Sequence, residues 1–160
     1  MEKNKAIMLA TLVDLRNCAV HESAHAVISE NYGVKTKVCI EKKGNSWLGI
    51  TYTDKIYETI MTEQQNKMIG LSGSVAEYIF KVINGQINRN KINLVDTLSE
   101  SDLKLVGKYA DSDLAQCYQM VTILLKDILL NANETFMYFG KYYKYDLKLL
   151  KKLSINIVVQ

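Results

Sequence analysis

The sequence predicts a mainly helical α+β domain, and three observations lead to this prediction. Apolar residues recur at helical spacing in most segments between residues 14 and 153. Only two short segments, residues 36–40 and 47–53, have the composition of strands, and a polar turn separates them. The 160 residues include no proline, which is typical of a chain built of helices with few rigid turns.

The first half of the chain predicts a helix, a hairpin and a second helix. The first helix covers residues 14–31 and stops before Gly33. The two strands follow, joined through the polar residues 41–46. The second helix opens after Thr62, which begins a capping box, and ends at Gly85 and the asparagine before it.

The second half of the chain predicts three further helices. Residues 86–95 are polar and are expected to form a loop. A shorter helix follows over residues 99–110, with Ser99 or the threonine two positions earlier as its cap. Two longer helices, residues 112–131 and 134–153, complete the prediction.

Length and composition predict a single domain over residues 1–160, since no repeat or linker divides the chain. Twenty Lys and Arg against 17 Asp and Glu leave a net charge of +3 that is spread along the sequence, so nucleic acid is not expected as a partner. No apolar run is long enough for a membrane span and no leader is evident, so no membrane association is expected. The three cysteines lie far apart, which favours a reducing, cytoplasmic location.

The only two histidines of the chain, His21 and His25, stand four residues apart on the first predicted helix. Residues four apart share a helical face, so both imidazoles can reach one metal ion. Glu22 lies about 100° around the helix from His21, where a general base would stand beside the metal. This pattern predicts a Zn²⁺ site in which water is activated for peptide hydrolysis, with Glu22 moving the proton.

A zinc site with an open position needs a third protein ligand, and no histidine is left to supply it. Cys18 lies on the same helical face, although three ligands from one straight helix seldom converge, and packing is the alternative role. Asp102 lies in the first turn of a separate predicted helix, where its alternative role is a charge favoured by the helix dipole. The residues alone leave the choice open.

Four segments, taken in order, resemble the peptidase domain of the FtsH-type membrane AAA zinc proteases. They are AVHESAHAV at residues 19–27, LGIT at 48–51, LSGSVAE at 71–77 and TLSESDL at 97–103. The resemblance extends over residues 16–110. It implies a zincin-like helical domain with a small hairpin after the HExxH helix.

The resemblance also implies roles for single residues. It makes His21, His25 and Asp102 the zinc ligands and Glu22 the catalytic base. Glu77 matches a family glutamate near the site, as a partner of a ligating histidine or as a solvated charge.

The chain departs from the family at several positions, since the family usually has glycine, arginine, a second acidic residue and asparagine in place of Ala24, Ser74, Tyr78 and Ser101. These departures indicate a distant member whose substrate preference cannot be transferred. No nucleotide-binding motif or membrane anchor is evident, so the chain is not expected to unfold its own substrates.

Two functions are therefore expected. The first is a zinc-dependent endopeptidase that acts on flexible or unfolded polypeptides, with a separate partner protein as an option. The alternative is a zinc-binding regulatory or interaction module with little or no proteolysis. The strand over residues 47–53 could bind a substrate by edge pairing, or it could be only the outer strand of the hairpin.

Oligomeric state stays open, and so does the role of the tyrosines near the end of the chain. These aromatic residues could mark a partner surface, or they could pack a terminal helix. They are Tyr138, Tyr142, Tyr143 and Tyr145.

Overall fold

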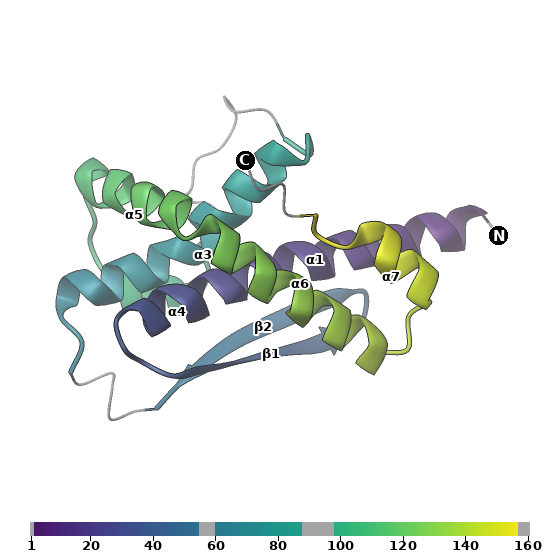
Figure 1. Ribbon diagram of the computed structural model, residues 1–160, viewed down its shortest axis with the longest axis horizontal. Coiled ribbons are helices and arrows are strands. Elements are labelled where there is room, and N and C mark those ends of the chain that lie inside the picture. The colour runs from purple at the N-terminus through teal and green to yellow at the C-terminus, as the bar shows by residue number, and fades with distance from the viewer. Residues whose placement is uncertain (1, 55–59, 88–97, 157–160) are drawn as a thin grey trace.

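One long helix packs against most of the other elements in the computed structural model, which describes residues 2–54, 60–87 and 98–156. Helix α1 (Glu2–Asn31) precedes a hairpin of strands β1 (Thr36–Lys43) and β2 (Ser46–Thr53). The helices that follow are α3 (Glu63–Ile83), α4 (Glu100–Val106), α5 (Asp111–Ile123), α6 (Leu125–Tyr142) and α7 (Leu147–Leu153). The predicted α+β class is confirmed, with six helices in the described ranges and one antiparallel hairpin after the first helix (Figure 1).

Helix α1 begins at Glu2 rather than at residue 14, so the motif lies in its second half. Residues 2–10 are exposed, whereas Leu12 and Leu15 are fully buried and begin the packed part of the helix. The prediction was too short because it required an apolar stripe, and an exposed helical end has none. No helix in the described part of the chain is both long and apolar enough to cross a membrane.

The hairpin packs against α1 and is longer than predicted. Its register runs from Thr36 opposite Thr53 to Lys43 opposite Ser46, so the turn contains only two residues. Gly44 takes φ 62° in this turn, a conformation that glycine adopts without strain. The Trp47 indole of β2 donates a hydrogen bond to the Thr11 carbonyl of α1 at 2.8 Å, which fixes the hairpin along the helix.

The hydrophobic core forms where α3 and α6 each pack against α1 (Figure 1). Helix α3 begins with the predicted capping box, since Thr62 and Gln65 exchange side-chain and backbone hydrogen bonds. It ends at Asn84, and Gly85 follows at φ 68°. The largest fully buried side chains come from these three helices together with β1, α4 and α7, and they include Phe136, Leu12, Leu15, Ile28, Met68, Leu71 and Ile128.

The boundaries predicted for the last helices are wrong. Helix α5 ends at Ile123, and α6 then runs without a break through residues 131–134, where the two predicted helices were separated. Asn133, taken as part of a break, lies inside α6, where its side-chain oxygen accepts a hydrogen bond from the Ile155 amide. Tertiary contact therefore overrides the weak helical preference of asparagine here. Helix α4 is also shorter than predicted, because Gly107 ends it at φ 64°.

A tight turn separates α7 from α6, which was also not predicted. Lys144 takes φ 62°, and Asp146 caps α7 by accepting hydrogen bonds from the amides of Lys148 and Leu149. Leu150 then packs onto Gly140 of α6, where an added Cβ would lie 2.4 Å from a leucine methyl carbon. The aspartate before an apolar helical run was an available cap signal.

The predicted loop over residues 86–95 lies mostly outside the described residues. Thr97, one of the two caps considered for α4, also lies outside them. Ser99, the other cap, accepts a hydrogen bond from the Asp102 amide through its side chain.

Asp146→Ala should destabilise the fold by about 1 kcal/mol, the usual effect of removing a helix cap. Asp14→Ala is the matched control, because Asp14 is exposed in the interior of α1 and caps nothing, so it should cause no loss. Urea unfolding of both variants measures the difference. Equal stability of the two variants would show that Asp146 does not hold the start of α7.

Candidate metal centre

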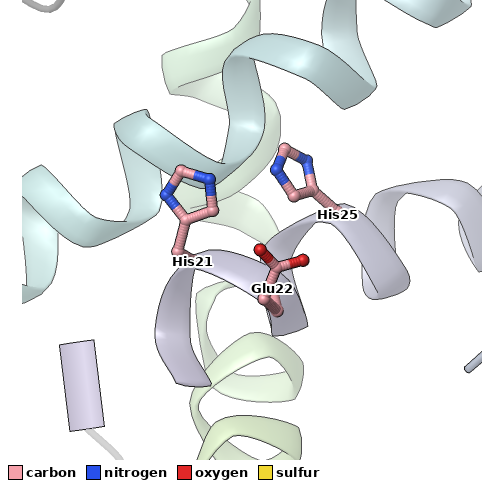
Figure 2. A group of neighbouring side chains, drawn as sticks. All are labelled: His21, Glu22 and His25. Carbon is pink, nitrogen blue, oxygen red and sulfur yellow. The ribbon is translucent and has the colours of Figure 1, made fainter. Parts of the chain in front are cut away.

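The second half of α1 brings together the motif residues His21, Glu22 and His25. One potential ligand atom from each residue lies within 4.8 Å of the other two. Figure 2 shows both imidazoles projecting from the same side of α1 toward α3, with the Glu22 carboxylate beside them. His25 and Glu22 are only 6% and 7% exposed, so the group lies inside the protein and could bind a metal.

Asp102 reaches the same point from α4. Its Oδ2 atom lies 3.1 Å from His21 Nε2, and its Oδ1 atom lies 3.3 Å from His25 Nε2. The short helix is held at this position by its Ser99 cap and by Val106, which packs closely over Gly70 of α3. The structure thus brings the four residues singled out in the sequence to one place, although 77 positions (102 − 25) separate His25 from Asp102.

The geometry around these side chains fits a metal ion. Ligand atoms bound at about 2.0–2.1 Å around a tetrahedral ion lie about 3.3 Å apart, close to the two histidine–aspartate distances. His25 Nε2 is buried and has no well-directed hydrogen bond, so a metal ion would give it the partner that it lacks.

Gly73 of α3 has no side chain, which leaves room for the two imidazoles to meet beside this helix. A Cβ on this residue would lie 2.5 Å from His21 Nε2 and 2.6 Å from His25 Nε2. Any larger residue would therefore occupy the position where the nitrogen atoms converge. Glycine in the interior of a helix usually lowers stability, so its presence here has a specific reason in this close approach.

The second nitrogen of each imidazole is bound to the protein. His25 Nδ1 lies 2.7 Å from the Ile69 carbonyl, to which it can only donate. His21 Nδ1 lies 3.1 Å from Glu77 Oε2, and Glu77 Oε1 pairs with Lys81 at 2.8 Å. Such partners fix the ring orientation and leave Nε2 as the ligand atom. Glu77 was expected to be either a partner of a ligating histidine or a solvated charge, and the structure shows the contact with a histidine.

The ionisable side chains of the site interact strongly with one another. Burial by itself lowers the pKa of His21, but hydrogen bonds to Asp102 and Glu77 and the nearby carboxylate charges outweigh it and raise the pKa to about 10. Burial opposes ionisation of Asp102, yet its hydrogen bond to His21 and the close approach of the His25 imidazole hold the pKa of the carboxyl well below its usual range. The same carboxylates that raise the pKa of His21 would stabilise a metal cation at this point, in competition with the proton.

Strand β2 positions Glu22, a role that the sequence did not reveal. The Thr51 hydroxyl donates a hydrogen bond of 2.6 Å to Glu22 Oε2. Gly49 allows the strand to approach, because a Cβ there would lie 2.5 Å from the Glu22 Cγ atom. Glycine within a strand indicates close approach of another group, so Gly49 was an available signal, whereas nothing in the sequence singled out Thr51.

Cys18 lies beside this contact but outside the group of potential ligands. Burial, followed by the charges of Glu22 and Glu77, raises the pKa of its thiol to about 12. The thiol therefore stays protonated at neutral pH, and Cys18 packs against Gly49 as a small half-buried side chain.

The candidate centre opens into a cleft of about 650 Å³ between β2, α3 and α4. Its walls include Trp47, Gly49, Met61, Asn66 and Leu105. Its size suits a ligand or a short stretch of polypeptide. No protein-family model matches the sequence, and no curated protein matches it either.

Gly73→Ala should abolish metal binding while the protein stays folded, because the new methyl group would stand where the imidazole nitrogens converge. Ile83→Ala, at an exposed position near the end of the same helix, adds no atom at the centre and is the control. Calorimetric titration with Zn²⁺ as the probe measures binding, and circular dichroism checks the fold. Unchanged affinity in a folded Gly73→Ala protein would exclude this point as the metal position.

Proposed function

We propose that this chain is a zinc-dependent endopeptidase, similar to the peptidase domain of the FtsH-type proteases, that hydrolyses flexible or unfolded polypeptides. The observation that carries the proposal is the meeting of Asp102 with both motif histidines, beside Glu22 and within an open cleft. Two histidines and one carboxylate form a ligand set that zinc uses in catalytic sites. In this proposal His21, His25 and Asp102 hold the ion.

Zinc, when bound, would supply a Lewis acid that polarises the peptide carbonyl. Glu22 would act as the general base, taking a proton from the attacking water and returning it to the leaving amine. The hydrogen bond from Thr51 occupies one carboxylate oxygen of Glu22, which leaves the other oxygen to carry the proton. Thr51 is thus a positioning residue for the base.

The outer edge of β2 pairs with no further strand in the described residues, which supports a polypeptide substrate. Lys43 and Ser46 flank a two-residue turn, so they form a hydrogen-bonded pair, and such pairs alternate along an antiparallel hairpin. Gly49 and Thr51 fall in the alternate class, with main-chain groups directed away from β1, and both line the cleft. An extended chain could pair with these groups, which a folded substrate could not do.

A cytoplasmic location also belongs to the proposal. The three cysteines are all free, and free thiols are typical of a reducing compartment.

Glu22→Gln should retain zinc but lose at least about 100-fold in the rate of casein cleavage, because the amide cannot accept the proton. Asp14→Asn, at an exposed position on the same helix, should cleave like the unaltered protein. Gel-based cleavage assays and metal analysis give the two readouts. Equal, negligible cleavage by zinc-loaded Glu22→Gln and unaltered protein over many disordered substrates would overturn the peptidase proposal in favour of a non-proteolytic zinc-binding module.

Asp102→Ala should lower zinc affinity by 100-fold or more, since a ligand is lost. Glu100→Ala removes a carboxylate from the same first turn of α4 and controls for the effect of charge at the helix start. Competition with a chromogenic chelator measures both affinities. Equal affinities in the two variants would mean that Asp102 serves the helix dipole and does not bind the metal.

A further inference from the structure

A second groove, of about 820 Å³, lies on the other side of the hairpin from the candidate metal centre. Strand β1 forms one wall and α6 the other, while Ala26 and Glu30 of α1 contribute to its lining. No part of the proposed catalytic chemistry uses this groove. Its residues are nevertheless arranged in a way that suits an extended peptide.

The wall formed by β1 is an unpaired strand edge. The Tyr143 hydroxyl donates to the Ile40 carbonyl at 3.2 Å and accepts from the Lys42 amide at 3.1 Å, so the outer edge of β1 faces α6. Val38, two residues before Ile40, directs its main-chain groups to the same edge. The sheet has two strands in the described residues, so no strand covers this edge. Tyr143 closes one end of it.

The opposite wall presents aromatic side chains at the surface. Tyr138 and Tyr142 are 63% and 64% exposed, and their rings stack 6.4 Å apart at an angle of 13°. Phe139 lies between them in sequence and also lines the groove. Tyrosine offers a large apolar area at a small loss of side-chain entropy on binding, and a cluster of exposed aromatic residues marks an interaction surface.

The charges around the groove favour a cationic partner. Three carboxylates line it, from Glu30, Glu41 and Glu134, against a single lysine, Lys37. All four of these side chains are exposed. Glu41 pairs with Lys43 at 3.4 Å, so the excess negative charge comes from Glu30 and Glu134. An apolar groove with a net negative rim suits a peptide in which apolar side chains alternate with Lys or Arg.

The groove and the cleft at the candidate metal centre share two lining residues. Leu48 and Ile50 of β2 line both spaces, and their side chains are partly exposed on the outer face of the hairpin. One extended polypeptide could therefore occupy the cleft, cross β2 and continue along β1 in the groove.

We propose that the groove between β1 and α6 binds an extended, positively charged, apolar segment of the polypeptide substrate at a distance from the cleaved bond, which rests on the proposed function. The segment adds to the edge of β1 by main-chain hydrogen bonds, and its apolar side chains pack on Tyr138 and Tyr142. This docking would retain a flexible chain close to the candidate metal centre.

The test measures binding separately from cleavage. A fluorescein-labelled synthetic peptide that alternates lysine with valine is titrated with zinc-loaded Glu22→Gln protein, and fluorescence anisotropy reports binding. Adding Tyr138→Ser and Tyr142→Ser should weaken binding about tenfold or more, as loss of aromatic anchors does. Adding Glu134→Lys should also weaken it. Adding Tyr118→Ser, an exposed tyrosine on α5 outside the groove, should leave binding unchanged.

Several results would overturn the proposal. One is equal binding by the tyrosine double variant and its Tyr118→Ser control, and another is equal affinity for a peptide that alternates glutamate with valine. Light scattering without peptide tests a further outcome. A dimer that is lost only in the tyrosine double variant would assign the groove to a second copy of the chain.

The cleavage assay separates this proposal from the proposed function. If protein with Glu22 intact cuts no substrate while peptide binding still depends on the groove, the docking inference stands and the peptidase proposal fails. If that protein cuts casein while the groove substitutions leave the affinity for the peptide unchanged, the peptidase proposal stands and the docking inference fails.

Discussion

Two imidazoles buried in a helical core must find partners for their nitrogen atoms, and the structure around them is organised by that requirement. A buried polar group without a partner costs about 1–3 kcal/mol, a large fraction of the stability of a small domain. Glu77 and the Ile69 carbonyl come from α3, and Asp102 comes from α4. The partners of two residues on α1 therefore determine where two other helices lie. His25 Nε2 alone lacks a directed partner, and it marks the point at which a cation fits.

This arrangement also requires that other segments approach α1 very closely. Gly73 on α3 and Gly49 on β2 leave no space for even one methyl group beside the two histidines and Glu22. Gly70 plays the same part for α4 by receiving Val106. Three glycines on two elements thus set the distances at the centre, because packing between backbones is more rigid than packing between long side chains. On the opposite edge of the hairpin, β1 meets α6 through the Tyr143 side chain, and the groove runs along this edge.

Spacing in the sequence was enough to predict the helix with its two histidines and Glu22, because residues four apart share a face in any helix. Asp102 could be selected over Cys18 only through the resemblance to a family, since no local pattern links residues so far apart. Thr51 could not be found, because a threonine in a strand carries no signal until its neighbour is known. Helix α6 was divided wrongly at Asn133, since its stabilising contact with Ile155 is tertiary and cannot be read locally.

The contact between α4 and α1 has a consequence for the unfolded chain. A bond from Asp102 to His25 closes a loop of 77 residues (102 − 25). A permanent link over such a length removes unfolded-state entropy equivalent to about 4–5 kcal/mol in the chain-entropy treatment of disulfides. An ion that joined these residues would therefore act as a reversible cross-link, and its departure would loosen the whole domain instead of a single cleft. The described cysteines form no disulfide, so the thermal stability of this domain would then depend directly on the supply of metal.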